Sequence, residues 1–337
     1  MTTEDTFSHE QLSAAEISSL WTVYQANTVD MCGISFFLVH VKDPEIQQII
    51  EKTLDITTDV KEQMEQIFRY EDYPVPQAFS EKDVNYNAPK LFSDELYLEY
   101  ILNMSDLNLI AYSSALTMAA RPDIIEFYSK NLEITKKLHN EIIELVKQKG
   151  IYVWVPTIPK ANKIKFVEKE SFLTGWFGDR RPLLGVEIAN LAYASKRNAI
   201  GQALITGFSQ VAESKEVRKY LEKGRDISGK HKDVFNEILN QDYLSGGLLK
   251  TSEVTNSTEA PFSDKLMMNL VTTLIASGIA QYGTAISASP RHDLGVQYTR
   301  LMAEIAKYAN EGANILIENG WMEQPPIAAD RKNLAQR

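Results

Sequence analysis

The chain contains an internal repeat, which constrains its fold more than any other feature of the sequence. Residues 92–150 and 262–320 align without a gap at an offset of 170. Both stretches begin with Phe-Ser-Asp, carry a tyrosine 20 residues later, continue with Arg-x-Asp and end with Asn-Glu and a glycine. Upstream the match continues at an offset of 171, which pairs Glu16 with Glu187 and Asn27 with Asn198. A repeat of this length predicts two copies of one structural unit.

Each copy is predicted to contain four helices. In the first copy, apolar spacing places helices near residues 13–41 and 44–69, from 93 to the Arg121-Pro122-Asp123 break, and from that break to Gly150. The second copy repeats the plan near residues 183–212, 215–240 and 262–289, with a last helix ending near 319. Asp43 before Pro44 and Ser93 are typical N-caps, and Gly150 is typical of the position that follows a helix.

The lengths of the connections predict how these helices are arranged. The first and second helices of each copy are joined by a tight turn, as are the third and fourth, so each pair should form an antiparallel hairpin. The middle connection has about 20 residues, enough to run the length of a helix of about 40 Å. A four-helix bundle with one long crossover between its second and third helices is the ferritin-like arrangement. The sequence therefore predicts an all-α protein of two tandem ferritin-like four-helix bundles.

These elements divide the chain into four parts. We assign residues 1–156 to the first bundle, 157–182 to a linker, 183–326 to the second bundle and 327–337 to a polar tail. A short helix is expected near residues 166–174. We expect the linker to pack on a bundle, because a segment rich in aromatic residues does not have the composition of a disordered chain. Its aromatic residues and those just before it are Tyr152, Trp154, Phe166, Phe172, Trp176 and Phe177.

Composition and charge exclude several classes of function. The net charge of −10 and the pI near 5.2 argue against nucleic-acid binding. Cys32 is the single cysteine, so no intrachain disulfide can form and a reducing compartment is expected. The first residues lack the pattern of a signal peptide, which favours a cytoplasmic location.

One long uncharged run needs a separate interpretation. Residues 266–290 carry no charge and are long enough for a membrane span. However, the run contains Asn269 and Gln281, and its counterpart in the first copy carries Glu95, Glu99 and Asp106. We therefore predict no membrane span, and we predict that this helix is the most buried element of the chain.

The positions that would hold metal ions in a ferritin-like bundle carry neutral side chains. Such bundles usually bind two metals through one Glu from each of two helices and Glu-x-x-His from each of the other two. The inward positions here are Asn27, Thr57 and Asn131 in the first copy and Asn198, Ser228 and Ile305 in the second. Hard divalent ions require several carboxylate oxygens. We therefore predict that neither bundle binds metal and that the protein has no cofactor.

We expect a polar layer at the middle of each bundle, either structural or ligand-binding. His231 lies inward without a carboxylate in its own helical register, and a hydrogen-bonded core histidine is the favoured interpretation. The tyrosines of the layer are expected to be buried with satisfied hydroxyls. Two repeated pairs, Arg121 with Asp123 and Arg291 with Asp293, are interpreted as structural, because an acid suits a helix start. The layer comprises Asn27, Thr57, Asn108, Tyr112, Tyr128, Asn198, Ser228, His231, Tyr282 and Tyr298.

The repeated pattern, the SFLTGWFGDRRPL linker and the NGWMEQPP ending resemble a family of endospore-forming bacteria, the domain of unknown function 3231. The resemblance covers nearly the whole chain and implies a duplicated ferritin-like bundle. Some members are described as candidate spore coat proteins, which adds a spore-associated location to the expectations. The family has no established activity, so no catalytic residue is implied.

Three functional hypotheses remain open at this point. The first is a non-enzymatic structural or assembly protein, with other copies of this chain or coat-type proteins as partners. The second is a protein that binds a small molecule in the mid-bundle polar pocket. The third is a residual metal-dependent oxidoreductase centred on His231 in the second bundle. The absence of the P-loop, nucleophile-elbow, His-Glu-x-x-His and Cys-x-x-Cys motifs favours the first two.

Overall fold

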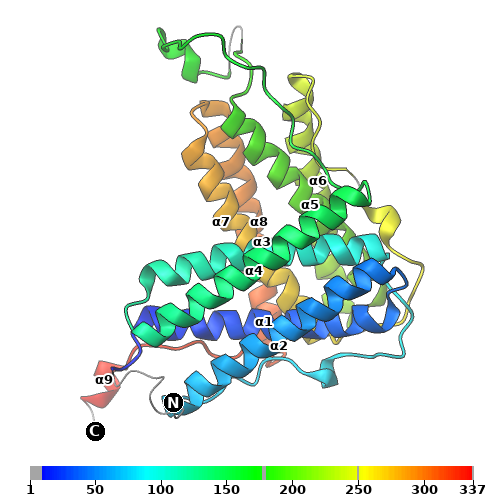
Figure 1. Ribbon diagram of the computed structural model, residues 1–337, viewed down its shortest axis with the longest axis vertical. Coiled ribbons are helices and arrows are strands. Elements are labelled where there is room, and N and C mark those ends of the chain that lie inside the picture. The colour runs from blue at the N-terminus through cyan, green and yellow to red at the C-terminus, as the bar shows by residue number, and fades with distance from the viewer. Residues whose placement is uncertain (1–9, 177–179, 249, 336–337) are drawn as a thin grey trace.

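The computed structural model describes residues 10–176, 180–248 and 250–335, and these residues form an all-helical protein (Figure 1). The bounds of the eight long helices differ from the predicted ones by no more than three residues. The first copy contains α1 (Ala14–His40), α2 (Pro44–Tyr70), α3 (Asp94–Met118) and α4 (Pro122–Gln148). The second contains α5 (Gly185–Val211), α6 (Lys215–Gln241), α7 (Asp264–Ala288) and α8 (His292–Glu318). Short helical turns are η2 (Glu81–Asp83), η3 (Glu170–Leu173), η4 (Thr251–Glu253) and α9 (Arg331–Leu334).

The helix ends are set by local capping. The Ser93 hydroxyl accepts a hydrogen bond from the Leu96 backbone N–H at 3.0 Å, and the Ser263 hydroxyl does the same for Leu266 at 3.2 Å. After α4 and α8 the chain turns at Gly150 and Gly320, with φ of 71° and 66°. This left-handed conformation strains any residue with a Cβ, so glycine is the residue that suits these ends.

Each copy forms one four-helix bundle with the predicted connections. Tight turns join α1 to α2, α3 to α4, α5 to α6 and α7 to α8, while α2–α3 and α6–α7 are joined by long crossovers. The all-α class, the two tandem bundles and the crossovers are therefore confirmed. Figure 1 shows the second bundle upright and the first bundle lying across its lower half.

The two copies are related by an internal pseudo-two-fold axis at their crossovers. Val84 forms an antiparallel bridge with Phe262, and Phe92 forms one with Val254. The offset of 170 turns the first pair into the second, so each copy presents the same surface to the other. The flanking hydrogen bonds repeat this exchange: Asn85 N–H to the Pro261 carbonyl at 2.8 Å, and Thr255 N–H to the Leu91 carbonyl at 2.9 Å.

The hydrophobic cores of the two bundles merge at this interface. Phe262 packs against Phe36 with ring centroids 5.3 Å apart and against Phe208 at 6.1 Å, and Phe92 packs against Phe208 at 5.8 Å. A Cβ on Gly207 would lie 2.4 Å from the Phe92 ring, so this glycine permits the close approach. One continuous cluster therefore includes the first bundle and the near half of the second, while a smaller cluster fills the far half of the second bundle.

The uncharged helix α7 is not the most buried element, contrary to the prediction. Its outward positions Thr273, Ala276, Ala280 and Thr284 are exposed, and α1 and α5 bury more residues than α7 does. The pseudo-two-fold axis places α1 and α5 in the interior and leaves one face of α7 along a cleft between the bundles. Among the described residues, no helix has both the length and the hydropathy needed to cross a bilayer.

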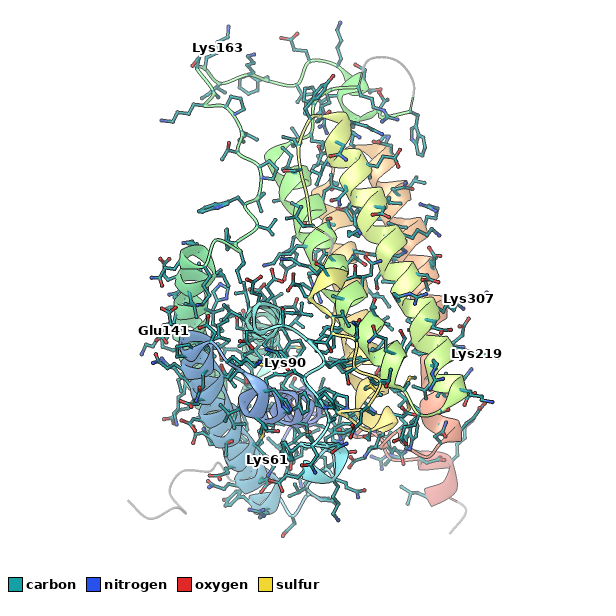
Figure 2. The ribbon with its side chains drawn as sticks, turned by 90° about the vertical axis from the view of Figure 1, so that its right-hand side faces the viewer. Lys61, Lys90, Glu141, Lys163, Lys219 and Lys307 are labelled. Carbon is teal, nitrogen blue, oxygen red and sulfur yellow. The ribbon has the colours of Figure 1, made fainter. Side chains whose placement is uncertain are left out.

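Residues 157–171 of the linker extend into solvent rather than packing on a bundle as expected, whereas Gly175 near its end is buried against Asp293 of α8. Trp154, Phe166 and Trp176 are 69%, 87% and 52% exposed. Figure 2 shows the segment around Lys163 projecting away from both bundles. Lysines alternate with the apolar residues there, and burying their ammonium groups against a bundle would be costly. Phe177 lies outside the described residues.

The chain after α8 returns to the first bundle. The Glu323 carboxylate accepts hydrogen bonds from the Gln25 side chain at 2.8 Å and from the backbone N–H groups of Gln77 and Ala78 at 3.0 and 3.2 Å. The sequence assigned these residues to the second bundle, but they also contact the first. The predicted polar tail contains the short helix α9.

Candidate functional site

The middle of the second bundle contains a chain of hydrogen-bonded polar side chains. Asn198 on α5 donates to the Tyr282 hydroxyl on α7 at 2.9 Å, and this hydroxyl lies 3.1 Å from Nδ1 of His231 on α6. Nε2 of His231 lies 3.2 Å from the carboxylate of Glu304 on α8. The layer therefore connects all four helices of this bundle.

Glu304 is the residue of this hydrogen-bonded layer that the sequence did not predict. His231 has a carboxylate partner after all, but from another helix rather than from its own register. Helical spacing places Leu301 and Ile305 on the inward line of α8, and Glu304 lies at the edge of that line. Its side chain is long enough to reach back over His231 while remaining partly exposed.

Burial keeps His231 neutral. The side chain is 0% exposed, and this desolvation lowers its pKa below the ordinary value, although the bond to Glu304 acts in the opposite direction. Burial raises the pKa of Glu304, but bonds from Lys230 and His231 outweigh it, so the carboxyl titrates below its usual range. At neutral pH the pair is therefore a neutral imidazole beside a carboxylate.

Polar side chains at the middle of the first bundle form hydrogen bonds with backbone carbonyl groups of the same bundle. Asn27 donates to the Thr57 carbonyl at 2.8 Å, the Thr57 hydroxyl donates to the Thr53 carbonyl at 3.0 Å, and Asn131 donates to the Phe127 carbonyl at 2.9 Å. A cavity of about 10 Å³ remains beside these residues. A cavity of that size is at the lower limit for one water molecule.

The four tyrosines form two equivalent pairs. Tyr112 and Tyr128 have ring centroids 6.1 Å apart in the first bundle, and Tyr282 and Tyr298 are 5.8 Å apart in the second. All are buried, but the hydroxyls of Tyr128 and Tyr298 form no hydrogen bond with the described residues, contrary to the expectation that each hydroxyl is satisfied. The ring of Tyr298 packs against the Phe235 ring with centroids 5.4 Å apart, and a phenylalanine neighbour offers no oxygen or nitrogen acceptor.

Two predicted members of the layer, Asn108 and Ser228, line cavities instead of joining these hydrogen-bond chains. Ser228 faces a cavity of about 80 Å³ inside the second bundle. Asn108 lines both the small cavity of the first bundle and the cleft between the bundles.

The repeated arginine–aspartate pairs fasten helix starts. Arg121 donates to both Asp123 oxygens at 2.8 and 2.7 Å and to Glu71 at 2.6 Å, and Arg291 binds both Asp293 oxygens at 2.8 Å. In each copy, a buried carboxylate from the first helix also accepts a hydrogen bond from the backbone N–H of this arginine. Glu16 accepts from the Arg121 backbone N–H at 2.9 Å and Glu187 from that of Arg291 at 3.3 Å.

The donor set does not fit the two metal ions that a ferritin-like fold implies. The second bundle offers one imidazole and one carboxylate at its middle, and the first offers amides and hydroxyls. Within the described ranges, no group of three or more His, Cys, Asp and Glu side chains is arranged to hold a metal ion. We therefore derive no metal-dependent chemistry from these layers.

A larger site lies between the bundles, where the sequence reasoning did not place one. A cleft of about 520 Å³ opens between α1 and α3 of the first bundle and α5 and α7 of the second. This volume is within the range of small-molecule sites, about 300–1,000 Å³. Its walls are mostly apolar, and its charged lining residues are Asp30 and Arg197.

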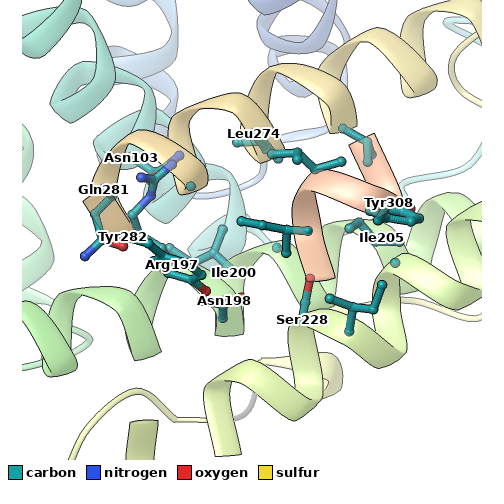
Figure 3. A pocket seen from close by; sticks show the side chains of 17 residues that line it. Asn103, Arg197, Asn198, Ile200, Ile205, Ser228, Leu274, Gln281, Tyr282 and Tyr308 are labelled. Atoms are coloured by element: carbon teal, nitrogen blue, oxygen red, sulfur yellow. Dashed lines mark hydrogen bonds between the residues drawn. The ribbon is translucent and has the colours of Figure 1, made fainter. Parts of the chain in front are cut away.

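The cleft adjoins the 80 Å³ cavity inside the second bundle. Asn103, Arg197, Leu274 and Gln281 line both. Figure 3 shows Arg197, Asn103 and Gln281 gathered at one end of the inner cavity, with Tyr308 and Ile205 at the other. The boundary between the two spaces is therefore polar, and the inner space ends in apolar side chains.

Arg197 is the unusual group at this boundary. It donates to the Ser277 hydroxyl at 2.5 Å and lies over the Tyr193 ring at 5.8 Å, but no carboxylate of the described residues forms a salt bridge with it. Burial lowers the pKa of this guanidinium below its usual value. The equivalent residue in the first copy is Ala26. A charged residue that is present in one copy only is the feature of the repeat that could have identified this site.

Comparison with protein families agrees with the two-copy architecture. The family model described as "Protein of unknown function (DUF3231)" matches residues 2–164 and again residues 171–334. The solved structure of a candidate spore coat protein from Bacillus halodurans C-125 aligns with 45% of this chain and 98% of its own, at 21% sequence identity and a TM-score of 0.41. No curated protein matches the chain.

Proposed function

The chain belongs to DUF3231, a family of unknown function, in two copies, and within that family we propose for it a non-enzymatic structural or assembly role. The observation that carries this proposal is that the polar side chains at the middle of each bundle form hydrogen bonds with the protein itself. Where a ferritin-like enzyme holds its metals, Asn27 is bound to the Thr57 carbonyl, and Asn198 is bound to Tyr282. Groups that already satisfy one another contribute to packing and offer no open coordination position.

Elemental analysis of the full chain, purified without chelator, tests the non-enzymatic part of the proposal. We expect no stoichiometric iron or manganese. About one or two metal ions per chain that are lost in His231→Ala would contradict the proposal and support a metal centre at His231 and Glu304. The variant Lys307→Gln, which changes an exposed residue of α8, controls for metal bound loosely at the surface.

The assembly role has its own test. The finer assignment, to a spore coat with coat-type partners or other copies of this chain, rests on the family resemblance of the sequence. A fluorescent fusion followed through sporulation should concentrate at the forming spore. Uniform fluorescence in the mother cell and its absence from purified spores would refute the coat role while leaving the metal result unaffected.

A second candidate function is the binding of a small organic molecule, and the cleft between the bundles favours it. The cleft is far larger than the mid-bundle cavity in which the sequence reasoning placed such a pocket. Ala111→Trp, on the α3 wall, should fill it, and Ala306→Trp on the exposed side of α8 is the matched control. A ligand that raises the melting temperature of the native chain and of Ala306→Trp, but not of Ala111→Trp, would establish this function.

A further inference from the structure

Within the described residues, the polar end of the inter-bundle cleft holds a guanidinium without a salt bridge and an amide donor without an acceptor. Arg197 donates to the hydroxyl and carbonyl oxygens of Ser277 and forms no salt bridge within the described residues. Close by, Nε2 of Gln281 is buried without a hydrogen-bond partner. A guanidinium and an amide N–H that face one space both require an acceptor, and the positive charge favours an anionic one.

The rest of the cleft is suited to an apolar chain. On α7 the wall is uncharged and includes Leu270, Leu274 and Ala280, and on α3 it includes Leu107 and Ile110. Ile110 is 59% exposed, which is unusual for an isoleucine of a helical bundle and leaves apolar surface that a ligand could cover.

Asp30, the cleft's carboxyl group, does not neutralise Arg197. Its Oδ1 accepts a hydrogen bond from the Tyr100 hydroxyl at 2.7 Å, and no salt bridge joins it to Arg197. Burial raises the pKa of Asp30 to about 7, so a large fraction of this carboxyl is protonated at neutral pH. The neighbouring acid Asp106 lies 3.4 Å from Nδ1 of His139 and forms no salt bridge with Arg197, although its charge acts on Arg197 at longer range.

We propose that the cleft binds an amphiphilic carboxylate of the fatty-acid type, with its carboxylate on Arg197 and Gln281 and its hydrocarbon chain between α3 and α7. This inference rests on the second candidate function, that the cleft is a binding site, and adds the chemical class of the ligand. The carboxylate supplies the negative charge that Arg197 lacks in direct contact and the acceptor that Gln281 lacks, and the hydrocarbon chain covers the apolar walls. A neutral molecule of the same shape would leave the guanidinium without a counter-charge in direct contact.

Calorimetric titration of the full chain with three probes of equal chain length tests the proposal. The probes are decanoate, decanol and decyltrimethylammonium. Decanoate should bind more tightly than decanol, and the cationic probe should not bind. Arg197→Gln should weaken decanoate about tenfold or more and leave decanol unchanged, because a hydrogen-bonded charge is lost while the walls remain. Lys307→Gln, which removes an exposed cation of α8, should change neither affinity.

The remaining variants separate the ligand class from the site itself. Ala111→Trp should abolish the binding of decanoate and decanol alike. Gln281→Leu, which removes a donor without removing charge, should weaken decanoate alone and serves if Arg197→Gln does not fold, as judged by circular dichroism. Equal affinity for decanoate and decanol, or full decanoate affinity in Arg197→Gln, would overturn the carboxylate inference but leave the cleft as a site. No binding of either probe to the native chain would overturn the inference and remove its basis in the cleft.

Discussion

Tyr220 on α6 and Tyr308 on α8 stack with ring centroids 4.2 Å apart, and each hydroxyl donates to the backbone carbonyl of the other residue, at 3.2 and 2.9 Å. Each ring also covers a glycine of the opposite helix, Gly312 or Gly224, four residues after the other tyrosine. This reciprocal contact joins α6 to α8 at close range. The first copy has Ile49 and Leu138 at the equivalent tyrosine positions, so the contact is particular to the second bundle.

Gly224→Ala should destabilise the protein. The new Cβ would lie 2.1 Å from the Tyr308 hydroxyl, which is held by its own hydrogen bond and cannot move without losing it. We expect a loss of about 1–3 kcal/mol in the free energy of unfolding, measured by urea denaturation. Gly201→Ala is the control: its Cβ would lie 3.7 Å from Ser228, and alanine favours a helix. Equal stability of the two variants would contradict this interpretation.

Glu16→Gln should lower stability at neutral pH but not in acid. Burial raises the pKa of Glu16, but hydrogen bonds from Arg121, Ala120 and Ser13 outweigh it and bring the pKa from 4.5 to about 2. A carboxyl with a depressed pKa stabilises the fold above its unfolded value and loses this contribution as pH falls towards the folded value. The variant should cost about 1.5–3 kcal/mol at pH 7, the range for losing hydrogen bonds to a charged group. Denaturation from pH 7 to 2 should show the difference between variant and native shrinking, and a constant difference would refute the assignment.

Asp30→Asn should stabilise the protein at high pH. Burial raises the folded pKa of Asp30 from 3.8 to about 7, so folding favours the protonated form and stability falls as pH rises between these values. Asparagine keeps an acceptor for the Tyr100 hydroxyl and carries no charge. The melting temperature of the variant should therefore exceed the native one at pH 8 and approach it at pH 4. A higher native melting temperature at pH 8 would show that the Asp30 carboxylate is stabilised by charge interactions.

His231→Leu should remove a pH dependence of stability. The folded pKa of His231 lies below its ordinary value of 6.5, mainly through burial, so protonation in acid favours the unfolded chain. Native stability should fall as pH decreases below about 6.5. The variant should lack this fall and also lose the bonds to Tyr282 and Glu304. His139→Leu, at a partly exposed histidine, is the comparison, and the same pH profile in native and His231→Leu protein would exclude a titrating role for His231.

The elements of this fold follow from local sequence. Capping serines such as Ser93, the glycines at 150 and 320, and the 3.6-residue period act within a few residues, so the helix bounds could be predicted from the chain alone. The ungapped repeat and the paired loop lengths then required two bundles of one topology. The neutral residues at Asn27 and Asn198 were likewise visible, because the inward face of a helix can be inferred from its own spacing.

The relation between the copies was decided only by tertiary structure. Spacing along α7 shows that its outer face carries no charge, but whether that face meets another helix or a cleft depends on a surface far away in the sequence. Glu304 lies at the edge of the inward face of α8 and contacts His231 on α6. The periodicity of a single helix does not predict such a contact between two helices. Arg197 is an ordinary charged residue in the sequence and becomes a candidate ligand anchor only when packing places it beside Ser277 of α7, at the cleft between the bundles. Periodicity is a property of one helix, whereas burial and pairing depend on which surfaces the whole chain brings together.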